Sequence, residues 1–95
     1  MKRAQKILEA ASERLDVPGE IMAGLPKLEL TGFAQLSIEH HKGILEYTSE
    51  AITVAVGIGK IRITGQKLSI HFMNHTYVMV TGELQNVELI SGRRP

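Results

Sequence analysis

The chain has no cysteine and no tryptophan, and aspartate occurs once, as Asp16. Without cysteine the protein has no disulfide framework, no thiolate metal site and no cysteine nucleophile. With one aspartate there is also no recognisable serine–histidine–aspartate arrangement for nucleophilic catalysis. We therefore expect a protein that is not an enzyme and that uses no cofactor and no metal.

Long apolar runs and an excess of one charge are also missing. No run approaches the roughly 20 residues that a membrane-spanning helix needs. The basic N-terminus is followed by Glu9, Glu13 and Arg14, not by the apolar segment of a signal peptide. The 11 basic and 10 acidic residues give a net charge of +1, which argues against a strong electrostatic footprint for nucleic acid. We expect a cytosolic protein, or one attached to something in the cytosol.

Residues 2–15 have the pattern of an amphipathic helix. Apolar side chains recur at spacings of three and four, which gives one apolar stripe: Ala4, Ile7, Leu8, Ala11 and Leu15. The stretch from Asp16 to Glu20 contains proline and glycine and ends this helix, so residues 1–25 form a helical leader. We expect the leader to dock on the β domain or a partner. A membrane-surface helix is the alternative, because basic residues cluster near its start.

The segment from Lys27 to Ile90 has strand character throughout, and we expect one domain over residues 1–95 with a flexible tail at 91–95. The stretch Ile61–Phe72 predicts a β-hairpin, with Gly65 in the first position of a two-residue turn. Similar short connections predict an antiparallel meander of about eight short strands, with two of its hairpins pairing Leu28–Leu30 with Leu36–Ile38 and Leu36–Ile38 with Leu45–Tyr47.

This all-β meander has one apolar face and must bury it by folding into a small sandwich, roll or barrel. The expected inward residues are Leu30, Ile38, Leu45, Val54, Ile61, Ile63, Leu68, Ile70, Phe72, Val78, Val80 and Val87. A weak internal echo relates residues 28–32, 61–65 and 78–82, each ending in Thr-Gly. A short β-solenoid is therefore the alternative fold. We expect structural turns at Gly32, Gly43, Gly65 and Gly82.

Four histidines and four basic residues are the other polar side chains that we examined for chemistry. The strand parity of His40 and His71 differs, so we expect loop and surface histidines and no zinc site. Glutamates such as Glu46 and Glu88 fall at outward, solvated strand positions. The basic residues Lys42, Lys60, Arg62 and Lys67 support an alternative function, a small barrel that binds a ligand or nucleic acid through a weak basic face.

A few apolar residues fall on the outward side of the predicted strands: Ile44, Ala55, Met79 and Ile90. The leader stripe covers some of them in one interpretation. In the other they form a surface for a protein partner or for self-association, since open strand edges invite strand addition. Our candidate partner-binding residues are Ile7, Leu8, Ala11, Ile44 and Met79.

The order of these features resembles a known family. The basic leader runs into Leu15–Ile21, then into Leu25–Gly32, Ile38–Leu45 and the Ile61–Phe72 stretch, and the chain closes with Val80–Leu89. This is similar to the YabP/YqfC family of small sporulation proteins, and among them to the YqfC branch. The resemblance implies a mother-cell protein of endospore envelope development, cytoplasmic or peripheral at the forespore membrane. It also implies a membrane-protein partner, and no catalytic residue.

Overall fold

A computed structural model describes residues 24–92, and this part of the chain consists of strands and their connections. Six strands follow one another: β1 (Lys27–Thr31), β2 (Gln35–Glu39), β3 (His41–Tyr47), β4 (Ala51–Val56), β5 (Gly59–Met73) and β6 (Tyr77–Ser91). They form one sheet in the order β1-β2-β6-β5-β4-β3, with every pair antiparallel. Of the predicted leader and tail, residues 1–23 and 93–95 lie outside the described residues, and Ser91, the first residue of the predicted tail, is the last residue of β6. The predicted all-β antiparallel class is confirmed.

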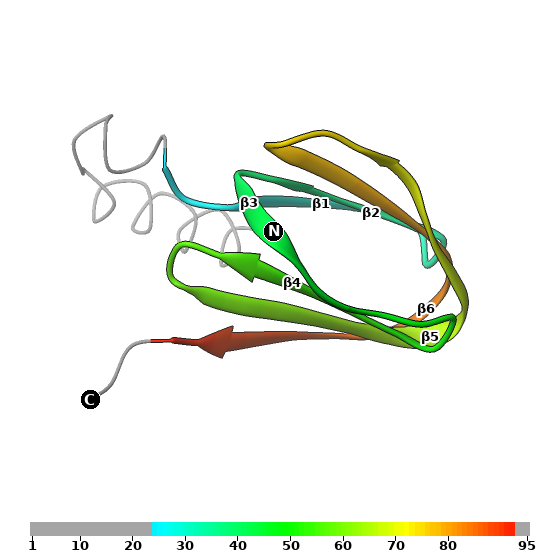
Figure 1. Ribbon diagram of the computed structural model, residues 1–95. Helices are drawn as coiled ribbons and strands as arrows, with labels where there is room; N and C mark the ends of the chain where they lie inside the picture. Colours follow the sequence, from blue (N-terminus) through cyan, green and yellow to red (C-terminus); the bar gives the residue numbers. More distant parts are fainter. Residues whose placement is uncertain (1–23, 93–95) are drawn as a thin grey trace, which may run out of the picture.

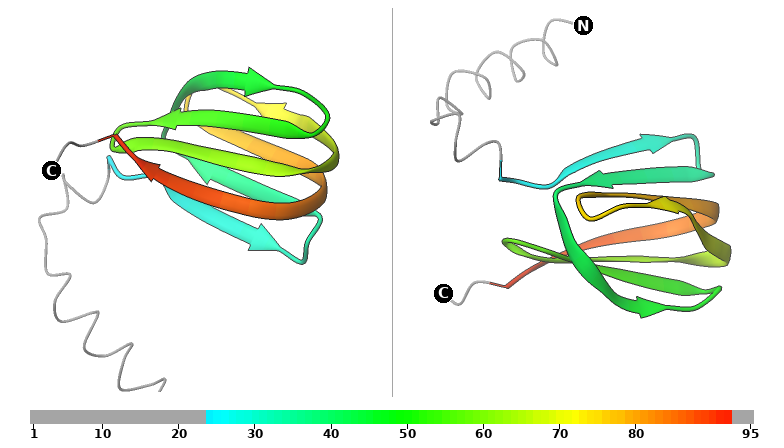
Figure 2. Two further views of the ribbon diagram at one scale, coloured as in Figure 1. Left: turned by 90° about the horizontal axis from the view of Figure 1, so that it is seen from below. Right: turned by 45° about the horizontal axis from the view of Figure 1, so that its top comes forward.

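The sheet folds over itself into two layers because β5 and β6 are long and bend together (Figures 1 and 2). One layer contains β1, β2, the first half of β6 and the second half of β5. The other contains β3, β4, the first half of β5 and the second half of β6. The result is a small open sandwich. The solenoid alternative is wrong, since the described strands pair antiparallel and do not stack in parallel coils.

Two predicted hairpin turns are wrong, and the strands number six instead of about eight. Gly65 and Gly82 lie inside β5 and β6, at the bend, and Gly65 pairs with Leu84 across the two strands. Alternation of apolar and polar residues is the same in a tight hairpin and in one bent strand. Gly65 is needed because of a close approach, not because of a turn, since an added Cβ would overlap the Glu83 carbonyl.

The predicted strand neighbours are correct in part. The β1–β2 hairpin has the expected register, with Leu28 opposite Ile38 and Leu30 opposite Leu36. The predicted pairing of residues 36–38 with 45–47 is wrong, because β2 pairs with β6. The chain crosses from β2 to the far edge of the sheet before the β3–β4–β5–β6 meander begins. A sequence of apolar strands does not distinguish these two neighbours of β2.

The core lies between the layers and contains most of the expected residues. Buried apolar side chains come from four of the strands, β2, β4, β5 and β6: Leu36, Ile38, Ala51, Ile52, Val54, Val56, Ile61, Ile63, Leu68, Val78, Val80 and Leu84. Three expected core residues are wrong, because Leu30, Leu45 and Phe72 are 52%, 62% and 51% exposed. A register shift between Ile44 and Glu46 turns Leu45 outward and Ile44 onto the core.

The two layers are built alike, so the sheet has an approximate internal twofold relation. At each edge of the sheet an outer hairpin pairs with one long strand, β1–β2 with β6 and β3–β4 with β5. Leu36 opposes Val80 in the first layer, and Ile52 opposes Ile63 in the second. Two parts of the sequence echo, residues 61–65 and 78–82, therefore occupy equivalent places.

The same relation extends to the bend, where the outer hairpins bind the long strands. The Gly82 N–H donates to the Ala34 carbonyl at 3.1 Å, and the Gly65 N–H donates to the Glu50 carbonyl at 3.1 Å. The predicted turn glycines thus have separate roles. Positive φ values occur at Gly32 (58°), Gly43 (133°) and Gly82 (138°). Such backbone conformations favour glycine.

We predict that Gly65→Val lowers the free energy of unfolding by about 3 kcal/mol or more, because the side chain would meet backbone and not a movable side chain. Chemical denaturation monitored by circular dichroism measures this. Gly57→Ala is the matched control, since its Cβ would come no closer than 4.0 Å to Lys42, and we expect a change within about 0.5 kcal/mol. Equal stability of the Gly65 variant and the native chain would contradict the backbone contact.

Candidate partner-binding surface

The outward face of the second layer carries a row of four polar residues, three of which are hydrogen-bonded to one another. Across β3, β4, β5 and β6 the row reads Glu46, Thr53, Arg62 and Glu88. The Thr53 hydroxyl donates to a Glu46 carboxylate oxygen at 2.8 Å, and Arg62 Nε donates to the same oxygen at 3.3 Å. These two bonds, with the positive charge of Arg62, hold the pKa of the Glu46 carboxyl below its ordinary value. The carboxylate of Glu46 therefore has its hydrogen-bond partners within this row, on the outward side that we expected for the glutamates.

The equivalent row of the first layer has a different chemistry. Across β1, β2, β6 and β5 it reads Glu29, Ser37, Met79 and Phe72. Glu29 matches Glu46 and Ser37 matches Thr53, but Met79 and Phe72 stand where the second layer has the arginine and a glutamate. Among residues 24–92, Glu29 forms no ion pair. The first layer therefore presents the apolar Met79 and Phe72 where its counterpart presents Arg62, which is in a salt bridge with Glu46, and Glu88.

Tyr77 enlarges this apolar area. It lies opposite Glu39, one row from Met79 on the same face, and its ring centroid is 5.9 Å from that of Phe72 with an interplanar angle of 53°. Such tilted aromatic pairs are favourable beyond the area they bury. We call Phe72, Tyr77 and Met79 the aromatic patch. Glu29 and Glu39 lie on the same face, with Lys27 directly opposite Glu39, so Glu29 is the acidic residue of this face without an opposite charge across from it.

Two irregularities of the chain place Phe72 and Tyr77 side by side. A register shift between Ile70 and Phe72 turns the Phe72 side chain to the outer face, opposite Met79. In the β5–β6 turn, the Asn74 side-chain oxygen accepts hydrogen bonds from the N–H groups of Thr76 and Tyr77 at 2.9 and 2.8 Å. Asparagine in this position is a readable turn signal. The register shift has no comparable sequence signal, so the outward position of Phe72 is missed by sequence reasoning.

The candidate partner-binding residues fall in three places. Met79 lies in the aromatic patch. Ile44 packs against the hydrophobic core, which is the direction opposite to the one expected for it. Ile7, Leu8 and Ala11 lie outside the described residues. Neither finding tests binding, so the role of these residues in binding a partner stays a prediction.

His40 and His41 lie at the corner between β2 and β3 and form hydrogen bonds there. His41 is buried, which makes the prediction of a surface histidine wrong for this residue. The Gly43 N–H donates to His41 Nδ1 at 3.1 Å, so Nε2 carries the proton and donates to the Asn74 carbonyl at 2.7 Å. His40 Nδ1 lies 3.1 Å from the Leu25 carbonyl. Within the described range 24–92, no three histidine, aspartate or glutamate side chains gather as metal ligands would.

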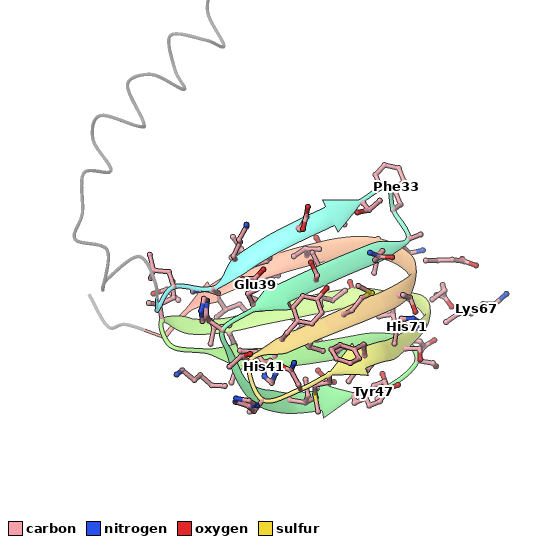
Figure 3. All side chains as sticks on the ribbon, turned by 90° about the horizontal axis from the view of Figure 1, so that it is seen from above. Phe33, Glu39, His41, Tyr47, Lys67 and His71 are labelled. Atoms are coloured by element: carbon pink, nitrogen blue, oxygen red, sulfur yellow. The ribbon has the colours of Figure 1, made fainter. Side chains whose placement is uncertain are left out.

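The four basic residues do not all gather on one face, because Lys60 and Arg62 lie two residues apart on the outward side of β5 whereas Lys67 lies at the bend. Arg62 is paired with Glu46, and Lys67 Nζ lies 3.9 Å from a carboxylate oxygen of Glu83. Figure 3 shows Lys67 at the bend and His41, the neighbour of Lys42, at the opposite end of the molecule. Nothing in this arrangement favours the alternative function of nucleic-acid or ligand binding through a basic face.

Comparison with known proteins places the chain in a family. Residues 24–95 match the YabP family. The chain belongs to the YabP family. The uncharacterized protein YqfC of Bacillus subtilis (strain 168) is 20% identical over 89 residues, which cover 94% of this chain and 96% of YqfC. The resemblance to the YabP/YqfC family is thus confirmed. No solved structure matches significantly. In residues 24–92 there is no helix with the length and hydropathy to cross a membrane.

We predict that stability falls with acid partly through Glu46. Its pKa is lowered in the folded state, so its contribution is present above the unfolded-state pKa and is lost as the pH falls through the folded-state pKa. The melting temperature of Glu46→Gln should therefore drop less than that of the native chain between about pH 7 and about pH 3. Glu50→Gln, in the β3–β4 loop, is the control for loss of one charge. Parallel pH profiles for Glu46→Gln and the native chain would contradict the role of this carboxylate.

Proposed function

We propose that the protein is a non-enzymatic protein-interaction module in endospore envelope development, and that it binds its partner through the aromatic patch. The observation that supports this most directly is the contrast between equivalent rows. The second layer neutralises its outward row with the Arg62–Glu46 pair, whereas the first layer places Met79 and Phe72 there. Both rows lie on the outward face of antiparallel ladders, so strand pairing itself does not require apolar side chains in the first.

The chemistry of the patch describes the partner that would fit it. Phe72 is 51% exposed, and covering it completely would remove aromatic surface from water, an effect of about 1 kcal/mol or more. Aromatic residues of this kind dominate binding energy at protein interfaces. The neighbouring Glu29, which forms no ion pair among residues 24–92, favours a partner segment that combines apolar residues with lysine or arginine. The membrane protein implied by the family resemblance would present such a segment at the forespore membrane, facing the mother-cell cytoplasm.

We predict that Phe72→Ser combined with Met79→Ser lowers the recovery of the partner by about tenfold or more, equivalent to about 1.4 kcal/mol of binding free energy. The measurement is affinity purification of the tagged chain from sporulating host cells, with quantitative mass spectrometry of the proteins that accompany the native chain. The same variant should reduce the yield of heat-resistant spores.

Phe33→Ser is the matched control. Phe33 is 81% exposed at the tip of the β1–β2 connection (Figure 3), away from the patch, so its loss removes an exposed aromatic ring without changing the proposed surface. Unfolding curves of both variants show whether the fold is retained. Undiminished partner recovery by the folded double variant, or an equal loss with Phe33→Ser, would reject the aromatic patch as the binding surface.

A further inference from the structure

The two long sides of the sandwich differ in the side chains that lie between the layers. On one side the β3 edge of the second layer faces the second half of β5 in the first layer. There Tyr47 crosses between the layers, and the Ile70 N–H donates to the Tyr47 hydroxyl oxygen at 3.0 Å. This bond and one with the Ser69 side chain lower the pKa of Tyr47. The side with β3 is therefore closed by a side chain of the domain itself.

The other side, between β1 and the second half of β6, is left open. Its equivalent of Tyr47 is Leu30, which opposes Leu36 as Tyr47 opposes Ile52. Leu30 has no polar group to bind across the gap, although its exposed fraction of 52% equals that of Tyr47. Leu89 on β6 belongs to the inward row with Ile61 and is 72% exposed, whereas Met73, its equivalent opposite Val78 on the other side, is 49% exposed. An apolar side chain on an inward row that remains so exposed indicates a missing cover.

An apolar cleft of about 490 Å³ opens on this side, at the end where the described chain begins and ends (Figures 1 and 2). Its principal apolar walls are Pro26, Leu28, Val56, Ile58, Ile61 and Leu89. Ile58, at the β4–β5 turn, is 48% exposed. The cleft thus lies between the first layer and the second, on the side away from Tyr47.

We infer that residues 1–23 of the same chain cover this side, with the apolar stripe of residues 4–15 seated on Leu28, Ile58 and Leu89. The described chain starts at Gly24, and Pro26, two residues further, is already part of the cleft wall. A helix over residues 2–15 would be about 21 Å long. The second half of β6, nine residues from Glu83 to Ser91, spans about 30 Å, so such a helix covers most of it.

The connection between the stripe and the cleft is long enough for the stripe to turn back. The eight residues from Asp16 to Ala23, which precede the described chain, span at most about 28 Å when extended, and they contain the proline and glycine that end the predicted helix. An attached segment also has a high effective concentration at its own domain. This occupant therefore has an advantage over a second copy or a separate partner, which would present the same kind of apolar surface without the tether.

The absence of cysteine allows a direct test in the full-length chain. We would combine Leu89→Cys with Leu8→Cys, on the stripe, and compare mild oxidation with the pair Leu89→Cys and Glu9→Cys, on the opposite face of the predicted helix. We expect an intramolecular disulfide to form about tenfold faster in the first pair. Leu8→Cys with His71→Cys, an exposed position on β5 (Figure 3), is the control for random collision and should form little disulfide.

A second measurement tests whether the leader shields position 89 from solvent, and it does not depend on collisions between two cysteines. The single variant Leu89→Cys is labelled with a maleimide, alone and with Ile7→Ser and Leu8→Ser added. We expect labelling to be about fivefold faster in the triple variant, and unchanged when Glu9→Ser and Glu13→Ser are added instead. Circular dichroism confirms that the sheet is retained.

The outcomes separate the possible occupants. An intramolecular disulfide specific to the stripe, with faster labelling when the stripe is lost, supports the inference. Disulfides that join two chains would show a second copy in the cleft, and equal disulfide rates for Leu8 and Glu9 or unchanged labelling would show that the leader does not cover it. Each of these results overturns the inference. Partner recovery has no part in the experiment, so its result does not depend on the proposed function.

Discussion

The fold depends on the close approach of β5 and β6 where both strands bend. A side chain does not fit at Gly65, where a Cβ would overlap the Glu83 carbonyl, or at Gly82, where it would lie 2.6 Å from the Lys67 carbonyl oxygen. Lys67 itself has a positive φ of 54°, which lets β5 change direction. Because the two strands bend together, one continuous sheet becomes two facing layers and encloses its own apolar face.

A bend of this kind interrupts the regular ladder and would leave backbone amides without partners, at about 1–3 kcal/mol for each one buried. The outer hairpins remove this cost. The Leu68 N–H donates to the Ser49 carbonyl and the Leu84 N–H to the Phe33 carbonyl, each at 2.8 Å. The connections of β1–β2 and β3–β4 thus stabilise the bend in equivalent ways. Because these backbone contacts stabilise the fold, the side chains of the outward rows can differ between the two layers.

Strand parity explains both how far the sequence could predict this structure and where prediction failed. Alternation with a period of two correctly indicates the inward positions of most strands and the β1–β2 register. It fails at register shifts, because one extra residue reverses the direction of every side chain that follows. Leu45 and Phe72 were placed in the core for this reason. Met79, on an uninterrupted part of β6, was correctly recognised as outward, and the rest of the aromatic patch was not.

The prediction of a turn at Gly65 failed for another reason. A glycine between alternating segments is equally compatible with a tight turn and with the close passage of another backbone. Only the pairing of distant segments decides between them. The sequence echo does not decide between them either, since the Thr-Gly pairs of residues 61–65 and 78–82 lie at the same bend whereas Thr31-Gly32 leads into the β1–β2 turn.

The two exposed apolar surfaces pose different physical problems. The aromatic patch lies on the face of a paired sheet, where backbone groups are satisfied and only side chains await a partner. On the open side, β1 pairs with β2 alone, and β6 beyond Thr81 pairs with β5 alone. Both edges therefore expose backbone donors and acceptors beside apolar side chains, a combination that promotes uncontrolled strand addition. A surface of that kind needs a cover that is always present, which a tethered segment provides and a diffusing partner does not. The patch carries no such risk, so it is the surface suited to regulated binding.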